Sequence, residues 1–259
     1  MGGTGKTPLC IEIFSILKNL NMNPAFIRRR YESYRDEVEL EKQAGPVYQN
    51  KKRIDAVQEA TKNNANVAIL DDGFQDSSIK KNLSIICFNE KQWIGNGLTI
   101  PSGPLREAVS EIKNYDAAFL NGEKSNKKLS KYLKKLNNDI KIFEAKYVPT
   151  NLGSFNLKNN FLFFCGLGNP SEFERTLKKY KFKIKEKIIF PDHYDFSDMD
   201  IFSIKKLAKT KKLNIITTEK DYLRLNKKNK KNVKFLKIDL NIKNMKNFSK
   251  FLIQRLWKN

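Results

Sequence analysis

Short apolar runs alternate with helix-like patterns along all 259 residues of this chain. The apolar character of residues 66–70 predicts a central parallel strand that is buried on both faces. Further apolar runs predict strands at residues 24–28, 46–49, 83–88, 117–120, 141–147, 161–168, 184–190, 214–220 and 233–240. Helical patterns occupy residues 8–20, 170–180, 197–213 and 244–257, and another begins near residue 54. This alternation predicts an α/β fold in which helices cover both faces of parallel sheets.

Two polar segments interrupt the pattern. Residues 29–43 are polar and charged, and residues 151–160 have the composition of a turn region. Because strands and helices start afresh after the second segment, we predict a larger domain at residues 1–150 and a smaller, basic α/β domain at residues 151–259.

Composition excludes several classes of protein. With 40% hydrophobic and 30% charged residues the chain is globular. No apolar run approaches the ~18 residues that a membrane-spanning helix needs, and the chain opens on Met-Gly-Gly-Thr rather than on the basic and then apolar residues of a cleavable leader. We therefore expect neither an integral membrane protein nor a secreted one. Three distant cysteines, Cys10, Cys87 and Cys165, predict buried thiols in a reducing cytosol and no metal cluster.

The net charge of +22 is unevenly distributed. Residues 1–150 hold 24 basic and 18 acidic side chains (+6), and residues 151–259 hold 26 and 10 (+16). A basic second half suits an anionic partner, either a nucleic acid or an anionic lipid surface. A solvated lysine-rich face, or lysine enrichment from AT-rich coding, explains the charge equally well. No recognisable nucleic-acid-binding motif is present, and we expect no nucleic-acid partner.

The first chemical motif is Gly-Lys-Thr at residues 5–7, which opens an amphipathic helical pattern. In a phosphate-binding loop, backbone N–H groups surround the β-phosphate, the lysine neutralises phosphate charge, and the threonine hydroxyl binds Mg²⁺. Lys6 and Thr7 fill these roles here, and an incidental turn is the alternative. The residues expected to bind nucleotide are Gly2, Gly3, Thr4, Gly5, Lys6 and Thr7.

The second motif is the pair Asp71-Asp72, which follows the apolar run at residues 66–70. In phosphate-loop enzymes, an aspartate at the tip of a neighbouring strand holds Mg²⁺. We therefore expect Thr7, Asp71 and Asp72 at a metal site. The alternative is that the aspartates only cap a turn.

Seven segments, in order along the chain, together resemble the tetraacyldisaccharide 4′-kinase family. They are GGTGKTP (2–8), DE (36–37), DDGFQ (71–75), NGLTIPSGPLRE (96–107), FCG (164–166) with NP (169–170), HYDF (193–196) and TTEKD (217–221). The resemblance implies a phosphate-loop NTPase-like fold and transfer of the γ-phosphate of ATP, with Mg²⁺, to the 4′-hydroxyl of an acylated glucosamine disaccharide 1-phosphate in lipid A synthesis. It also implies a peripheral enzyme on the cytoplasmic face of the bacterial inner membrane, in contact with an anionic membrane surface.

The resemblance assigns roles to further residues. Asp36 matches a carboxylate that the family pairs with a histidine, and His193 is the single histidine in the chain. A carboxylate near the attacking hydroxyl accepts its proton, and a histidine behind it orients the carboxylate. We therefore expect Asp36, His193 and Lys6 to be catalytic. The residues that match substrate-binding positions are Glu37, Ser102, Arg106 and Glu107.

Other interpretations remain open from the sequence alone. Asp36 lies in a charged run that would also suit a solvated face, and the segment around Ser102 suits a plain turn before a helix. A kinase for another small hydroxylated substrate would share the first two motifs, and a nucleotide-dependent nucleic-acid-binding switch would explain the charge.

The family resemblance also implies a segment before the phosphate loop. Relatives of this kind have an apolar membrane-associating helix and a first strand there, and Met1 stands where the family usually has valine. We expect upstream in-frame codons for this segment, and an immediate stop codon would refute that expectation.

Overall fold

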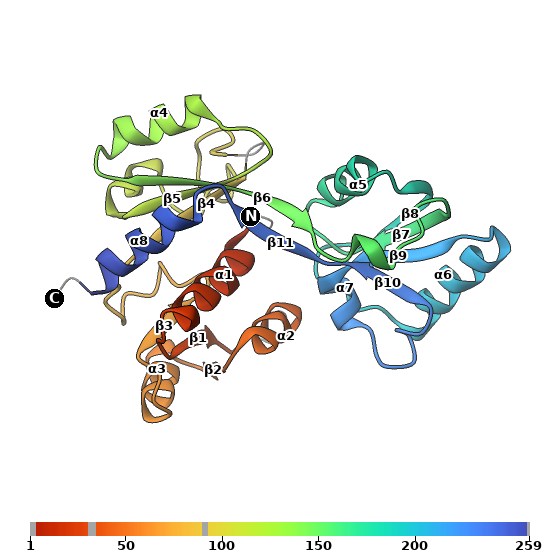
Figure 1. The fold of residues 1–259 in the computed structure, drawn as a ribbon, viewed down its shortest axis with the longest axis horizontal. Helices are drawn as coiled ribbons and strands as arrows, with labels where there is room; N and C mark the ends of the chain where they lie inside the picture. Colours follow the sequence, from red (N-terminus) through yellow and green to blue (C-terminus); the bar gives the residue numbers. More distant parts are fainter. Residues whose placement is uncertain (1–3, 31–34, 90–92, 258–259) are drawn as a thin grey trace.

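The computed structural model describes residues 4–30, 35–89 and 93–257, with Arg35 described by its backbone only. Figure 1 shows two bodies side by side. The first contains α1 to α4 and α8, and the second contains α5 to α7. The long strands β6 and β11 extend from the first body towards the second.

The first body begins with a three-stranded parallel sheet in the order β2-β1-β3. Its strands are β1 (Pro24–Arg29), β2 (Val47–Asn50) and β3 (Val67–Leu70). Its helices are α1 (Lys6–Asn19), α2 (Arg35–Ala44) and α3 (Arg53–Lys62). Successive residues of β1 point to opposite faces, so Phe26 packs on α1 while Ala25 and Ile27 pack on α3.

A second sheet of the first body has the order β11-β6-β5-β4. Its strands are β4 (Ile85–Asn89), β5 (Ala117–Asn121), β6 (Lys141–Pro149) and β11 (Ile238–Ile242), of which β11 is antiparallel to β6. Its helices are η1 (Val109–Asn114), α4 (Lys127–Leu136) and α8 (Met245–Leu256). Residues of α1 and α8 pack on one face, and α4 with η1 packs on the other.

The second body has one parallel sheet in the order β10-β9-β7-β8. Its strands are β7 (Asn160–Cys165), β8 (Lys183–Ile189), β9 (Asn214–Thr218) and β10 (Val233–Leu236). Its helices are η2 (Leu152–Ser154), α5 (Pro170–Lys179), α6 (Asp198–Thr210) and α7 (Glu219–Arg224). Because β7 is buried on both faces, Phe161 and Phe163 meet α5 while Leu162 and Phe164 meet α6. The predicted α/β class, with helices on both faces of parallel sheets, is confirmed.

Three expectations need correction. The strand at residues 66–70 is not central: β3 is the last strand of its sheet, and only Ile69 of the four residues is buried. The polar segment at residues 29–43 contains α2, whose Val38 and Glu41 point inward. The single strand expected at residues 233–240 is two strands in different sheets, since Lys237 separates β10 from β11.

The end of the chain returns to the first body. Residues of β11 pair with β6, and Phe248 of α8 is fully buried against Phe119 and Phe143. Residues 238–257 therefore pack with the first body, and not, as the expected division at residue 150 implied, with the second.

A cavity of about 680 Å³ lies between β3 and β4, the end strands of the two sheets of the first body. Apolar side chains of both strands and of α1 line most of it, and Lys6, Asp71 and Asp72 line one end. Because this cavity lies beside β3, the strand is less buried than its sequence predicts.

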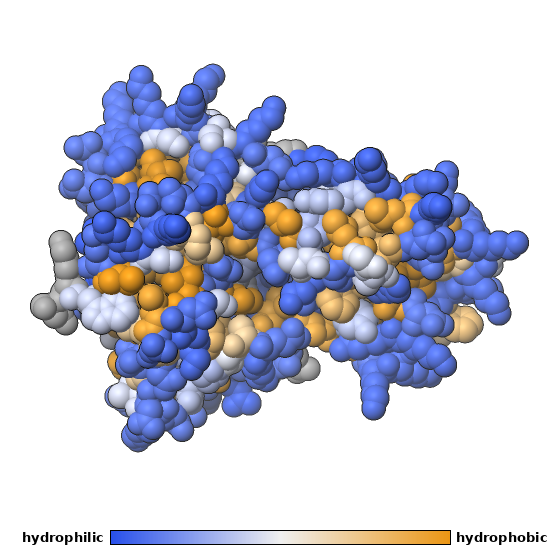
Figure 2. All heavy atoms as spheres, viewed as in Figure 1, coloured by the Kyte–Doolittle hydropathy of each residue, from blue (hydrophilic) through white to orange (hydrophobic). Residues whose placement is uncertain are grey.

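Hydrophilic residues cover most of the outline of the molecule in Figure 2, and hydrophobic ones are visible towards the middle of this face.

Candidate functional site

The phosphate loop lies at the start of α1. Gly5, the residue before this helix, has a φ of 95°, which is the left-handed region that favours glycine. A Cβ atom at Gly5 would lie 3.0 Å from the Tyr147 hydroxyl and 3.1 Å from the Asn121 amide nitrogen, so the loop is held closely against β5 and β6. Thr4 is partly buried, and the expected loop residues Gly2 and Gly3 lie outside the described residues.

Two residues of α1 contact the two aspartates that follow β3. The Thr7 hydroxyl donates a hydrogen bond of 2.7 Å to Asp71, and the Lys6 ammonium lies 2.9 Å from an oxygen of Asp72. Asp71 is buried, whereas the Asp72 side chain is 41% exposed. The structure therefore brings together all four residues that the two motifs predicted.

Of the expected substrate-binding residues in the segment 96–107, one reaches this site. Arg106 forms an ion pair with Asp72. Glu107 accepts a hydrogen bond of 3.0 Å from the Tyr115 hydroxyl, and both residues line the cavity. Ser102 is exposed, and its carbonyl accepts a hydrogen bond from the Asn96 side chain.

The pair expected from the family resemblance is also present. Asp36 lies in the first turn of α2, and His193 lies in the loop between β8 and α6, so the two residues come from different bodies. Their nearest atoms, His193 Nδ1 and an Asp36 oxygen, are 3.6 Å apart. Gly166 makes room for this loop: its carbonyl accepts the His193 N–H, and a Cβ there would lie 3.0 Å from the Pro191 carbonyl.

The surroundings of this pair favour charged forms of both side chains. Burial raises the pKa of Asp36, but hydrogen bonding to His193 and the charges of Arg224 and Lys220 outweigh it, so this pKa lies well below its usual range. The hydrogen bond to Asp36 raises the pKa of His193, although partial burial opposes the shift. Asp36 is therefore an ionised carboxylate at neutral pH, with an imidazole beside it.

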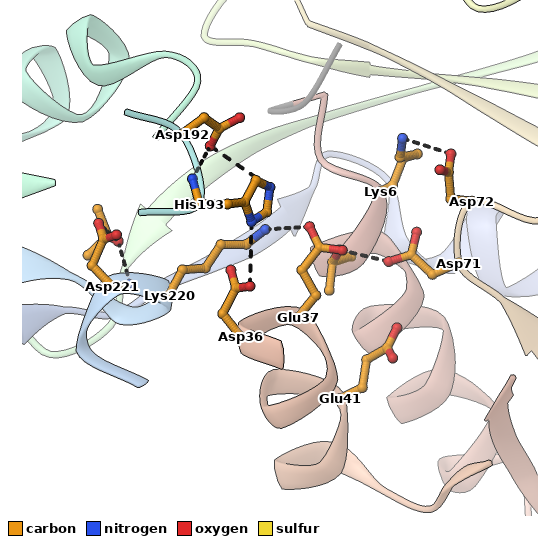
Figure 3. A network of polar contacts seen from close by, with 12 residues as sticks. Lys6, Asp36, Glu37, Glu41, Asp71, Asp72, Asp192, His193, Lys220 and Asp221 are labelled. Atoms are coloured by element: carbon orange, nitrogen blue, oxygen red, sulfur yellow. Dashed lines mark hydrogen bonds and ion pairs between the residues drawn. The ribbon is translucent and has the colours of Figure 1, made fainter. Parts of the chain in front are cut away.

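Arg28, at the carboxyl end of β1, was not identified from the sequence. Its guanidinium contacts three carboxylates, with Glu41 at 2.6 Å, Glu37 at 3.1 Å and Asp71 in a short ion pair. Glu37 follows Asp36 directly, so Arg28 links the Asp36 region to the phosphate-loop region. Figure 3 shows the carboxylates of the two regions, with Asp36 and Glu37 on α2 and Asp71 and Asp72 near Lys6. A hydrophobic strand that ends in an arginine gives no sign in the sequence that the arginine is buried.

Helix α7 of the second body contributes two more cations that the sequence did not single out. Lys220 lies 2.8 Å from Glu37, and Arg224 lies 2.8 Å from Asp36. The two basic residues are four positions apart, so they lie on one face of α7, opposite two consecutive carboxylates in the first turn of α2. The family-like segment TTEKD (217–221) also begins this helix, since Thr218 is the N-cap of α7.

The aspartates after β3 offer what a phosphate-bound cation needs. One oxygen of Asp71 has no hydrogen-bond partner among the described residues, and the other accepts the Thr7 hydroxyl. The described part of the chain has no group of three or more His, Cys, Asp and Glu side chains that could hold a metal ion. Asp71, Asp72 and the Thr7 hydroxyl nevertheless fit Mg²⁺, which is commonly held by one or two carboxylates together with substrate phosphates.

Comparison with known proteins agrees with this geometry. The family model described as tetraacyldisaccharide-1-P 4′-kinase matches residues 36–257. A tetraacyldisaccharide 4′-kinase of Pelagibacter ubique is 45% identical over 100% of this chain and 83% of its own length, and one of Rickettsia conorii is 30% identical over 93% and 79%. A crystal structure of LpxK from Aquifex aeolicus in complex with ATP has a TM-score of 0.71 and 23% identity, and the match covers 99% of this chain and 86% of that one.

The structural likeness supports the fold, and the sequence relatives and the family model supply the identity. The match at residues 36–257 spans most of the chain and includes Asp36, both aspartates after β3 and His193. This chain belongs to the tetraacyldisaccharide 4′-kinase family.

Proposed function

We propose that this chain transfers the γ-phosphate of ATP to the 4′-hydroxyl of tetraacyldisaccharide 1-phosphate, an acylated glucosamine disaccharide. The observation that carries the proposal is the position of the Asp36–His193 pair, which is joined to the phosphate-loop residues through Glu37 and Arg28. A kinase needs a base for the acceptor hydroxyl close to a nucleotide-phosphate site, and these contacts connect the two. The names of the relatives and the ATP bound in the Aquifex structure supply the two substrates.

The nucleotide phosphates would lie at the start of α1. Backbone N–H groups there point at the ligand, the helix dipole favours negative charge, and the Lys6 ammonium adds a full positive charge. Lys6 is now paired with Asp72, so a bound phosphate would compete with this carboxylate for the ammonium.

The residues that would hold Mg²⁺ are Thr7, Asp71 and Asp72. When bound, Mg²⁺ supplies neutralisation of charge on the transferred phosphate. The Thr7 hydroxyl and the unpaired oxygen of Asp71 are the groups in place for it.

The acceptor side of the reaction would rest on Asp36. The 4′-hydroxyl loses its proton as it attacks phosphorus, and the Asp36 carboxylate takes that proton. His193 lies against one oxygen of Asp36 and orients it. A carboxylate with a lowered pKa remains ionised, and therefore able to accept the proton, throughout the physiological pH range.

Four residues would bind the acceptor or the nucleotide around this centre. Arg106, already paired with Asp72, offers a bidentate donor to a phosphate. Glu37 lies between Lys220 and Arg28 at the junction of the two bodies. The family resemblance assigns substrate binding to Glu107 and Ser102. The same segment exposes the apolar side chains of Leu98 and Ile100, which suit contact with an acyl chain.

The two predicted domains would share the catalytic pair, since Asp36 belongs to residues 1–150 and His193 to residues 151–259. The relative position of the two bodies would then set the distance within the pair. This arrangement makes closure of the two bodies on each other a step in assembling the site.

The protein would act as a peripheral enzyme at an anionic lipid surface, on the cytoplasmic face of the bacterial inner membrane. Within the described residues, no helix combines the length and apolarity needed to cross a bilayer. One side of α6 exposes Met199 (73%) and Phe202 (63%), and Lys206 and Lys209 continue the same exposed side. Exposed apolar side chains beside lysines are typical of surfaces that bind anionic lipid.

The proposed activity is tested by incubating tetraacyldisaccharide 1-phosphate with the protein, ATP and Mg²⁺ and measuring the lipid mass. A gain of one phosphate, lost in Asp36→Asn, is expected. A gain of phosphate that is unchanged in this variant would contradict the role of Asp36. Hydrolysis of ATP without any gain of phosphate on the lipid would contradict the lipid acceptor.

A further inference from the structure

Arg224 connects the second body directly to the proposed base. Its side chain is 7% exposed, and one terminal nitrogen lies 2.8 Å from Asp36 Oδ2 and 3.4 Å from His193 Nδ1. The other terminal nitrogen contacts Asp221 at 3.1 Å and the Gly166 carbonyl at 3.3 Å. The guanidinium therefore spans two carboxylates, one from each body.

The far side of Arg224 is fixed by a buried network. Asp221 is fully buried and accepts hydrogen bonds from the Gly166 N–H at 3.1 Å and from the Thr218 hydroxyl at 2.6 Å. Gly166 lies at the end of β7, and Thr218 is the N-cap of α7. Because Asp221 cannot move without breaking these bonds, it holds the planar guanidinium in one orientation.

The orientation of Arg224 decides which oxygen of Asp36 is engaged. Oδ2 accepts from Arg224, whereas Oδ1 faces His193. A carboxylate held by only one partner turns about its Cβ–Cγ bond, whose rotation is broad. With Oδ2 fixed, Oδ1 keeps its position beside the imidazole.

We propose that Arg224, held by Asp221, is a positioning residue for the Asp36 carboxylate in the phosphoryl-transfer reaction. The proposal rests on the function proposed above, in which Asp36 accepts the proton of the acceptor hydroxyl. Arg224 fixes one oxygen and keeps the carboxylate ionised, and the other oxygen remains available beside His193. This role requires a fork of donors, so lysine replaces arginine only in part.

Several charged groups face Asp36, and they share the control of its protonation. They are His193 from the loop after β8, Lys220, Asp221 and Arg224 from α7, and Glu37 from α2 itself. Loss of Arg224 removes a cation and a hydrogen bond, and both effects raise the pKa of Asp36. Asp36 would then be protonated over a wider acidic range and would lose its function as a base there.

The test uses the full chain with the substitutions Arg224→Gln and Arg224→Lys. The titration of Asp36 is followed by ¹³C NMR of labelled aspartate carboxyls, with the resonance assigned from its absence in Asp36→Asn. The same variants are measured for kcat and for the KM of ATP. Lys211→Met, which removes an ion pair with Glu186 of β8 at the C-terminal end of α6, is the control and should match the parent.

We expect Arg224→Gln to raise the Asp36 pKa, to lower kcat by roughly 10- to 100-fold and to leave the KM of ATP within about twofold. Arg224→Lys should give intermediate values for the pKa and for kcat. If Arg224→Gln does not fold, Arg224→Lys carries the test, because its Asp36 pKa must still lie above that of the parent.

An Asp36 titration that is the same in the parent and in the folded variants would overturn the proposal. A uniform loss of kcat at every pH without a pKa change would also overturn it, since that is the result of a purely structural role. The NMR titration needs no turnover, so a protein that failed to phosphorylate the lipid would refute the proposed function while the link from Arg224 to Asp36 could still be measured.

Discussion

At the scale of single residues, Arg28 and Arg224 organise the site, and each contacts more than one carboxylate. Arg28 contacts Glu37, Glu41 and Asp71, and together these carboxylates hold the pKa of the arginine high against the opposing effect of burial. One guanidinium cannot fully neutralise three acids. Burial therefore raises the pKa of Glu41 to about 7, although the charge of Arg28 opposes the shift.

This shift predicts a pH dependence of stability. Between pH 4.5 and about 7 the unfolded chain has released the Glu41 proton while the folded protein retains it, so the free energy of unfolding falls as the pH rises through this window. Glu41→Gln has no proton to release. We compare the free energy of unfolding of Glu41→Gln with that of the parent, measured by urea denaturation. This difference should shift in favour of the variant by about 1–3 kcal/mol from pH 5 to pH 8, because only the parent loses stability through Glu41.

A control for this experiment is Glu39→Gln, which removes an exposed carboxylate from the same helix. Its difference from the parent should be nearly the same at both pH values. An equal difference for Glu41→Gln at pH 5 and pH 8 would show that Glu41 is ionised throughout.

The sequence predicted only the part of the site that is carried by motifs. Lys6, Thr7 and the two aspartates were identified because Gly-Lys-Thr before a helix, together with aspartates after an apolar strand, is typical of phosphate-loop enzymes. Arg28 and Arg224 were not, because whether an arginine is buried between acids depends on which elements meet in the fold.

At the scale of elements, the ends of strands position the site. The start of α1 lies at the carboxyl edge of the sheets, where Asp71 follows β3 and Arg28 is the second-last residue of β1. In the second body, Gly166 directly follows β7 and supports the loop that carries His193. The apolar runs predicted most of these strands, because burial on both faces gives a continuous signal in the sequence.

Where the sequence misled, the surroundings of an element decided its role. Helix α2 has only a few apolar residues, and its inner face places Glu41 against Arg28 of β1. Its sequence pattern therefore resembles that of a solvated segment. Residues 233–240 form one apolar run, but Leu236 and Ile238 belong to different sheets. No local signal marks where a strand leaves one sheet and joins another.

The close packing at Gly166 predicts an effect of a single methyl group. In Gly166→Ala the new Cβ would lie 3.0 Å from the Pro191 carbonyl and 3.3 Å from the Tyr194 Cβ, so the loop shifts by a few tenths of an ångström and the position of His193 relative to Asp36 changes. We expect kcat to fall by roughly 10-fold or more, since a small displacement of catalytic groups has large effects on rate.

The matched control is Gly153→Ala, where nothing lies within 4 Å of the added Cβ. This variant should retain the parental kcat in the same assay. Parental activity in Gly166→Ala would mean that the loop tolerates the methyl group and that Gly166 does not position His193.

At the scale of the whole molecule, the last helix completes the first body. Phe248 is fully buried, and its ring centroid lies 5.4 Å from that of Phe119 and 4.9 Å from that of Phe143. Phe248→Ala should therefore lower the free energy of unfolding by about 3–5 kcal/mol. Phe202→Ala, at a position that is 63% exposed, should change it by less than about 0.5 kcal/mol. Equal effects of the two substitutions in chemical denaturation would contradict the packing of α8 on this core.

The exposed side of α6, proposed above as a lipid-binding surface, predicts the effect of substitutions on vesicle binding. The double substitution Met199→Asp with Phe202→Asp should weaken binding to vesicles that contain phosphatidylglycerol by roughly 10-fold or more, because it removes apolar contact and adds negative charge. Co-sedimentation measures this binding, and raising the salt concentration should weaken binding of the parent as well.

The control for the vesicle experiment is Tyr132→Asp, on α4 of the other body, at a position that is 36% exposed. It adds the same type of charge away from α6 and should bind nearly as the parent does. If all three proteins bind equally, α6 is not the docking surface.

The proposed division of roles gives nucleotide binding to one set of residues and acceptance of the acceptor proton to Asp36, which His193 orients. It is tested most directly by measuring the ATP dissociation constant and the rate of lipid phosphorylation together in Asp36→Asn and Lys6→Met. We predict that Asp36→Asn binds ATP as the parent does but loses roughly 100-fold or more in rate, whereas Lys6→Met loses both. An Asp36→Asn protein that phosphorylates the lipid at the parental rate, or that no longer binds ATP although it is folded, would contradict this division of roles.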